Sequence, residues 1–216
     1  MGRLRYDCDA IVKLKASLNY FIDNPNLYKG EWNNKVFENN NPIEIEIGCG
    51  KGRFVFLKAI DNPSINFVAI DKSETILVKL LNKIKDYQTP VNNLKIICTN
   101  AQELTKVFAE KEVDKIYLNF VDPWPKKRHE KNRLTYYQNL KIILSLLKDA
   151  ERIEFKTDNI DFFNYSLIEL KTNQLNIVSA TKDLYESELL ANNIATEYEQ
   201  KWISKGNKIN KLILVK

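Results

Sequence analysis

Short stretches rich in β-branched and aromatic residues alternate with stretches of helical periodicity along most of this chain. The stretches that predict strands are residues 43–47, 66–70, 94–98, 115–120, 152–155, 175–179 and 208–215. Residues 54–59, 74–85, 101–108, 135–147 and 160–170 instead carry apolar side chains three and four positions apart. This alternation predicts an α/β fold with a seven-stranded, mostly parallel sheet and helices on both faces. No long helical pattern separates the last two strands, so we expect an antiparallel hairpin at one edge.

The length of 216 residues is typical of one domain with a sizeable core. An asparagine run ending at Pro42 predicts a boundary between an N-terminal arm (1–40) and the main domain (41–216). With 44% hydrophobic and 28% charged residues, the composition excludes a largely disordered chain. No apolar run approaches the roughly 20 residues that cross a bilayer, so we expect no membrane partner and a cytoplasmic location.

Three cysteines, Cys8, Cys49 and Cys98, are scattered without the paired spacing of a metal clip or a disulfide framework. We therefore expect reduced cysteines and no metal. The sequence leaves open whether the protein is a monomer or a homodimer.

The positive charge is concentrated in one segment. The net charge is +5, and residues 126–133 contain five basic residues and one acidic residue. Such a run predicts a phosphate-binding surface, although a solvated face or a helix start would look the same. The candidate phosphate contacts are Lys127, Arg128, Lys131 and Arg133.

A glycine-rich loop, residues 48–52, follows the first predicted strand and precedes a helix. Glycine permits a positive φ and close approach of a ligand, and a helix N-terminus presents free N–H groups. The G-x-G-x-G spacing differs from the G-x-G-x-x-G of dinucleotide enzymes, which favours S-adenosylmethionine over NAD. Gly48 and Gly50 are therefore candidate cofactor contacts, and a tight turn without a ligand is the alternative.

Polar residues stand where the first three strands end, and ligands of open α/β sheets bind at that edge. Glu46 would lie near an amino-acid group, Asp71 would accept hydrogen bonds from ribose hydroxyls, and Asn100 would meet an adenine edge. For Asp71 the alternative is a helix N-cap, with Glu74 completing a capping box.

After the fourth predicted strand the chain reads Val121, Asp122, Pro123, Trp124, Pro125 and then the basic run. The two prolines predict a rigid loop with Asp122 and Trp124 in extended geometry. Such a loop would hold a carboxylate, an indole and several bases in a fixed arrangement. A plain Asp-Pro turn with a packed Trp is the alternative.

Residues 117–135, YLNFVDPWPKKRHEKNRLT, closely resemble the signature of the bacterial tRNA (guanine-N7-)-methyltransferases, and so do residues 45–54, 155–159 and 196–199. The resemblance covers roughly residues 27–206 and implies a Rossmann-like class I methyltransferase fold. It implies that Glu46, Asp71, Asn100 and Asp122 line an S-adenosylmethionine site, with Asp122 also catalytic. The positions that it implies for tRNA contact are Lys126, Asp158, Thr196, Glu197, Tyr198 and Glu199. It also suggests that the N-terminal arm (1–40) contacts tRNA and that residues 41–216 form an S-adenosylmethionine-dependent methyltransferase domain.

Structural alternatives exist for some of these positions. Asp158 would also serve as a helix cap, and Thr196 with Glu199 has capping-box spacing, which is compatible with binding. The chain departs from the usual family pattern at Val121, Asn132 and Tyr185, where Ser, a basic residue and His are common.

The resemblance implies methyl transfer to N7 of a guanine in the tRNA variable loop. N7 carries no proton, so Asp122 is expected to hydrogen-bond the guanine N1–H and 2-amino groups rather than to act as a base. Three alternatives stay open: a methyltransferase of the same fold acting on another substrate, a non-catalytic RNA-binding protein that keeps the cofactor pocket, and, last in rank, a nicotinamide enzyme.

Overall fold

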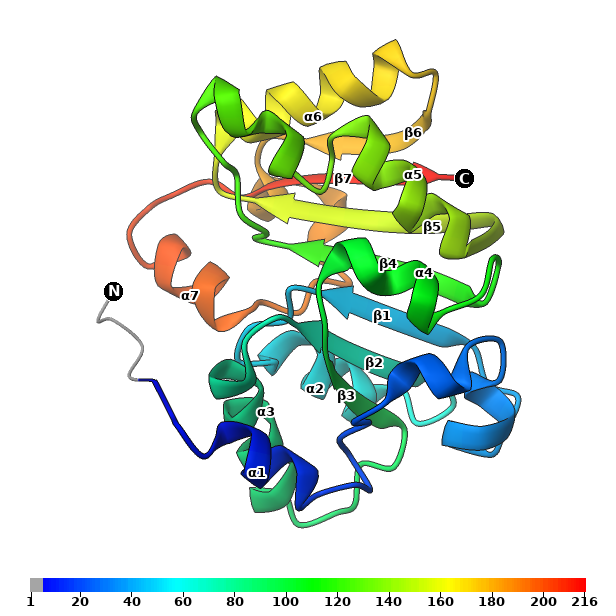
Figure 1. Ribbon diagram of the computed structural model, residues 1–216. Coiled ribbons are helices and arrows are strands. Elements are labelled where there is room, and N and C mark those ends of the chain that lie inside the picture. Colours follow the sequence, from blue (N-terminus) through cyan, green and yellow to red (C-terminus); the bar gives the residue numbers. More distant parts are fainter. Residues whose placement is uncertain (1–5) are drawn as a thin grey trace.

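The computed structural model describes residues 6–216 and contains a seven-stranded sheet in the order β3-β2-β1-β4-β5-β7-β6 (Figure 1). The strands are β1 (Ile43–Ile47), β2 (Asn66–Asp71), β3 (Leu94–Cys98), β4 (Val113–Asn119), β5 (Leu147–Thr157), β6 (Asn176–Thr181) and β7 (Asn210–Val215). The pairs among β1 to β5 are parallel, and β7 runs antiparallel to both β5 and β6. The predicted sheet and its antiparallel pair are confirmed.

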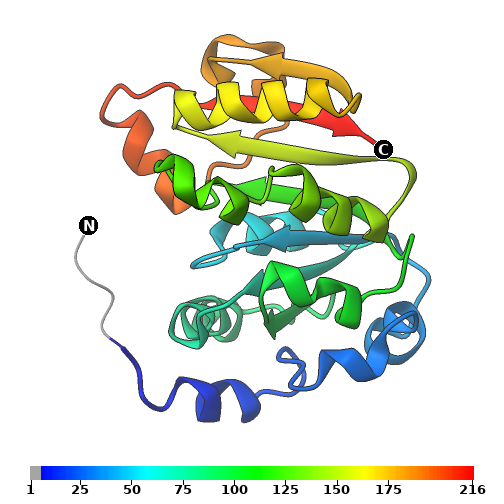
Figure 2. The same ribbon diagram turned by 45° about the horizontal axis from the view of Figure 1, so that its top comes forward.

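Helices cover both faces of this sheet (Figures 1 and 2). One face carries α1 (Ala10–Lys15), α2 (Arg53–Asp61) and α3 (Glu74–Asp86), and the other carries α4 (Leu104–Val107), α5 (Tyr137–Leu146) and α6 (Ile160–Thr172). A short helix, α7 (Glu197–Ile203), lies beyond the carboxyl ends of β4 and β5 (Figure 1). Brief helical turns are η1 (Pro25–Tyr28), η2 (Trp32–Phe37), η3 (Ala101–Glu103), η4 (Lys127–Asn132), η5 (Leu184–Glu186) and η6 (Glu188–Leu190).

Alternation along β1 explains how its residues reach two different environments. Ile43, Ile45 and Ile47 enter the apolar cluster beneath α4, α5 and α6, whereas Glu44 and Glu46 point to the opposite face. The Tyr117 hydroxyl donates to Glu44 Oε2 at 2.7 Å. Glu46 is the carboxylate nearer the carboxyl end, where β1 lies between β2 and β4 and the strand order reverses. That switch point is where open α/β sheets bind ligands.

The expected N-terminal arm packs against the domain along the β3 edge. Phe21 forms a parallel bridge with Ile96, and Ile96 N donates to Tyr20 O at 2.7 Å. Trp32 is fully buried, stacks on Phe108 at 4.9 Å and donates from Nε1 to the Val107 carbonyl. The arm thus extends the core, and its contact with tRNA stays a prediction.

Two predicted boundaries are wrong. The helix expected over 101–108 is divided into η3 and α4, and β5 begins at Leu147, where a helix was expected to end. Residues 148–151 lack an alternating apolar pattern, but pairing of Leu147 with Val113 across a bulge extends the strand. No helix within residues 6–216 is long and apolar enough to cross a membrane. Over the same residues, no three His, Cys, Asp or Glu side chains group as a metal site.

Candidate active site

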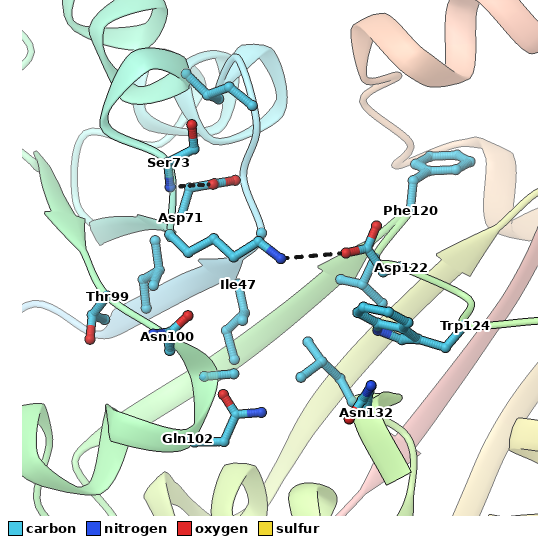
Figure 3. Close-up of a pocket in the computed structure, with 17 residues that line it drawn as sticks. Ile47, Asp71, Ser73, Thr99, Asn100, Gln102, Phe120, Asp122, Trp124 and Asn132 are labelled. Carbon is cyan, nitrogen blue, oxygen red and sulfur yellow. Dashed lines mark hydrogen bonds and ion pairs between the residues drawn. The ribbon is translucent and has the colours of Figure 1, made fainter. Parts of the chain in front are cut away.

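A cavity of about 480 Å³ opens at the carboxyl edge of the sheet. Four of the predicted site residues line it: Gly48, Asp71, Asn100 and Asp122. Asp71 and Asn100 approach from one side, and Asp122 approaches from the other with Phe120 and Trp124 (Figure 3). Its volume lies within the range of small-molecule sites. The residues brought together come from the ends of β1, β2, β3 and β4.

Asp71 connects β2 to the glycine loop. Its Oδ2 accepts from Gly50 N and its Oδ1 from Ser73 N, both at 3.0 Å. The N-cap position of α3 is occupied by Ser73, so the alternative interpretation of Asp71 and Glu74 as a capping box is wrong. Gly50 does not line the cavity, and its effect on the site passes through this bond to Asp71.

Glycine is required in the loop at position 52. Gly52 has a φ of 73°, and a Cβ there would lie 2.6 Å from Leu80 Cδ1 of α3. Gly50 has a φ of 56°, but a Cβ there would meet nothing within 4 Å. The loop therefore packs closely against α3 at Gly52 and has open space beside Gly50.

Glu46 does not line the cavity, because it is buried on the α2 face of β1. Asn119 Nδ2 donates to its Oε1 at 2.8 Å. Burial raises the pKa of Glu46 to about 8, opposed by the Asn119 hydrogen bond and the nearby Lys156. Glu46 Oε2 and Asn119 Oδ1 are buried without a hydrogen-bond partner. A pair of unsatisfied acceptors suits a donor such as an ammonium group.

The Asp122 side chain is 68% exposed, and its Oδ2 lies 3.7 Å from Lys72 Nζ across the cavity (Figure 3). Phe120 and Trp124 flank it with φ values of 53° and 42°. The expected extended geometry of Trp124 is therefore wrong. A tertiary contact accompanies this conformation, because Arg133 donates to the carbonyls of Pro123 and Trp124.

The basic run divides into exposed and buried parts. Lys126 precedes η4, and Lys127, Arg128 and Lys131 on that helical turn are exposed, as a phosphate-binding surface requires. Arg133 is buried and directs its guanidinium inward, so the prediction that Arg133 contacts phosphate is wrong in this structure. The side chain reaches acceptors within the chain, and this placement removes it from the surface.

The segment 196–199 begins α7. Thr196 Oγ1 accepts from Glu199 N at 2.9 Å, and the capping box is complete. Glu199 is fully buried, with donors on both carboxylate oxygens: Tyr185 and Asn193 on Oε1, and Lys156 and Thr196 N on Oε2. The prediction that Glu199 contacts tRNA therefore conflicts with this arrangement, because its acceptor sites are already used.

The remaining predicted residues of this region are accessible to different degrees. Glu197 pairs with Lys83 of α3. Tyr198 donates its hydroxyl to Asp158 Oδ2 at 3.3 Å, and its ring lies 5.1 Å from that of Phe120. The N-cap of α6 is Asn159, which accepts from Phe162 N, so the alternative of Asp158 as that cap is wrong. Asp158 and Tyr198 thus form a polar pair beside the Asp122 loop.

Comparison with known proteins shows the family to which the chain belongs. A family described as putative methyltransferase matches residues 40–212. The sequence is 52% identical over 214 residues to the tRNA (guanine-N(7)-)-methyltransferase of Malacoplasma penetrans, covering 99% of this chain and 97% of that protein. The chain belongs to the tRNA (guanine-N7-)-methyltransferase family. The corresponding enzyme of Geobacillus sp. (strain WCH70) is 45% identical over 207 residues, covering 96% and 92% of the two chains.

Solved structures share the fold of this family member at much lower identity. An antibiotic-related methyltransferase aligns with a TM-score of 0.62 at 17% identity, covering 87% of this chain and 92% of its own. A 30S ribosomal A1408 methyltransferase from an uncultured bacterium aligns with a TM-score of 0.56 at 17% identity, covering 87% and 93%. The predicted Rossmann-like methyltransferase fold is confirmed.

Sequence reasoning missed two residues of this methyltransferase site. Asn119 holds Glu46, and Lys156 donates from Nζ to Glu199, Asn193 and the Ile194 carbonyl. Asn119 is the last residue of β4, and Lys156 is the second-last residue of β5. A polar side chain at the end of an otherwise apolar strand is a sequence signal that could have identified both. Burial lowers the pKa of Lys156, and Glu199 opposes that shift.

Proposed function

We propose that this chain transfers a methyl group from S-adenosylmethionine to N7 of a guanine in the variable loop of tRNA. The observation that carries the proposal is the position of Asp122. Its exposed carboxylate lines the cavity at the switch point, and the exposed bases Lys126, Lys127, Arg128 and Lys131 follow it closely in the sequence. A cofactor on one side and a nucleic acid on the other would meet at this side chain. The names of the similar proteins support tRNA as the substrate.

The residues present fit S-adenosylmethionine. Asp71 offers a carboxylate to ribose hydroxyls and Asn100 an amide to an adenine edge, and both line the cavity. Neither Glu46 nor Asn119 lines the cavity, so for these residues to hold the amino group the cavity would have to extend to their buried, unpartnered acceptor atoms. When bound, the cofactor supplies the electrophilic methyl group of its sulfonium.

Asp122 would select guanine rather than remove a proton. N7 has a lone pair in the ring plane and no hydrogen, so attack requires no base. A carboxylate accepts two hydrogen bonds at once, which matches the N1–H and 2-amino donors of guanine. Its negative charge also offsets the positive charge that the base gains on methylation. Lys72 Nζ lies 3.7 Å from Asp122 Oδ2, and this exposed pair would separate when substrate binds.

The tRNA would lie over the exposed bases and the α7 segment. Lys126, Lys127, Arg128 and Lys131 are available for phosphates. Asp158 and Tyr198 stand next to Phe120 at the entrance, where an unstacked base would pass. Thr196 and Glu197 lie at the N-terminal end of the same helix.

The experiment is methyl transfer from labelled S-adenosylmethionine to unmodified tRNA, followed by digestion to nucleosides. We expect the label in 7-methylguanosine, and tRNA whose variable-loop guanine is replaced by adenine should accept none. Label in another nucleoside, or in another RNA only, would contradict the proposed substrate. Cofactor binding without transfer to any RNA would contradict catalysis.

A further inference from the structure

The loop that carries Asp122 has an unfavourable backbone on both sides of this residue. Phe120 and Trp124 have φ values of 53° and 42°, in the left-handed region that bulky residues rarely adopt. Such conformations persist only where the surrounding structure determines them, and they concentrate at functional sites. The loop therefore needs contacts that hold it in place.

Arg133 supplies these contacts at the far end of the loop. Its Nε donates to Pro123 O at 2.9 Å, and its Nη2 donates to Trp124 O at 3.0 Å. The guanidinium also lies 4.1 Å from the centre of the Tyr165 ring. A planar fork with several donors suits two adjacent carbonyls, whereas a lysine ammonium would act as a point charge.

Arg133 is itself fixed on the side away from the loop. Asn139 Nδ2 donates to the Arg133 carbonyl at 2.8 Å, and the Arg133 residue is only 9% exposed. At the near end of the loop, Phe120 N donates to the Lys156 carbonyl at 2.8 Å. The loop that carries Asp122 is thus hydrogen-bonded to β5 at one end and to the buried Arg133 guanidinium at the other.

We infer that Arg133 is a positioning residue that holds the 120–125 loop, and through it Asp122, in the geometry used for methyl transfer. The inference rests on the proposed function for its activity readout. It separates Arg133 from Lys127, Arg128 and Lys131, although all four belong to one basic run. Arg133 acts on the protein backbone, and the other three face solvent.

The first test measures the backbone and requires no activity. Hydrogen exchange of the amides of residues 120–122, 124 and 126, which exclude the two prolines, is compared in the wild-type protein, Arg133→Lys and Lys131→Met. We expect faster exchange in this segment for Arg133→Lys only, with the exchange of β1 and β4 unchanged as evidence that the variant folds. Unchanged protection of residues 120–126 in Arg133→Lys would overturn the inference.

The second test separates kcat from tRNA binding. Arg133→Lys is expected to lower kcat at saturating tRNA by about 10- to 100-fold, because small misplacements of a catalytic group are costly. The salt dependence of its tRNA binding should match that of the wild type. Lys131→Met should instead lower the slope of log K against log salt by about 0.7–0.9.

The outcomes distinguish this inference from the proposed function. A wild-type protein that does not methylate tRNA contradicts the proposed function, while the exchange experiment still decides the role of Arg133. A wild-type kcat in Arg133→Lys contradicts the inference alone. If Arg133→Met lowers the salt slope as Lys131→Met does, Arg133 binds phosphate and the inference is wrong.

Discussion

Two lysine–carboxylate pairs lie at the carboxyl edge of the sheet, and they differ in burial. Lys156 Nζ and Glu199 Oε2 are 2.7 Å apart, with side chains 3% and 0% exposed. Lys72 Nζ and Asp122 Oδ2 are 3.7 Å apart, with side chains 65% and 68% exposed. An exposed pair contributes little to stability and separates readily. Removing one partner of a buried pair instead destabilises the fold strongly, because the other charge is left buried and unpaired.

The difference in burial suggests two roles: the Lys156–Glu199 pair belongs to the structural framework of the site, and the Lys72–Asp122 pair to the part proposed to act on substrate. Glu199 joins the start of α7 to β5 and has no acceptor to spare for a substrate. Asp122 has no such bonds and can exchange Lys72 for a ligand. The same residue types therefore serve opposite purposes, which leads to the following predictions.

The largest expected effect is on stability at the buried pair. Lys156→Met should lower the free energy of unfolding by about 3–5 kcal/mol, because it leaves Glu199 buried and unpaired. Urea unfolding monitored by circular dichroism measures this loss. The control Lys156→Met with Glu199→Gln removes the buried charge and should lose less than Lys156→Met alone. A loss below about 1 kcal/mol for Lys156→Met would show that the pair is not part of the framework.

The next effect concerns Glu46, whose pKa is raised to about 8 by burial. Its ordinary value is 4.5, so the folded protein holds a proton that the unfolded chain releases. Stability should therefore fall with rising pH between about 4.5 and 8, by at most about 1.4 kcal/mol per pH unit from this group.

Glu46→Gln removes this dependence. The melting temperature of Glu46→Gln relative to wild type should increase from pH 5 to pH 8 and change little above that. The measurement is thermal unfolding in matched buffers without cofactor. A difference between the two proteins that is constant over this range would contradict the burial of an ionisable Glu46.

The smallest expected effect is at the exposed pair. Lys72→Met should change the free energy of unfolding by less than about 0.5 kcal/mol, since exposed pairs contribute little. The same urea experiment used for Lys156→Met provides the comparison. A loss as large as that of Lys156→Met would remove the distinction between the two pairs.

The sequence predicts the features that depend on local pattern. Apolar stretches such as residues 66–70, together with the glycine loop, gave the right elements in the right order, because strands buried on both sheet faces are apolar along their length. Asp71, Asn100 and Asp122 line one cavity as expected, since they lie at or within three residues of the ends of strands that meet at one edge. Helix caps were less predictable. The N-cap of α3 is Ser73 rather than Asp71, and the N-cap of α6 is Asn159 rather than Asp158.

The charged residues that were misplaced depend on contacts distant in sequence. Arg133 was expected to contact phosphate as part of the basic run, and Glu199 was expected to contact tRNA because of the family resemblance. Both are buried because partners elsewhere satisfy them: loop carbonyls for Arg133, and Lys156, 43 positions away, for Glu199. The left-handed φ of Trp124 arises in the same way, since a tertiary contact overrides the preference of a residue before proline.

We propose that Asp122 recognises guanine and offsets the charge that develops during methyl transfer, whereas the buried pair of Lys156 and Glu199 only supports the fold. The most direct measurement is the single-turnover rate of methyl transfer to tRNA by Asp122→Asn, together with its tRNA affinity and melting temperature. We predict a rate lower by about 100- to 1,000-fold, as for loss of a charge-stabilising group, with affinity and melting temperature close to wild type. A near-normal rate, or a loss of stability comparable to that of Lys156→Met, would contradict the account.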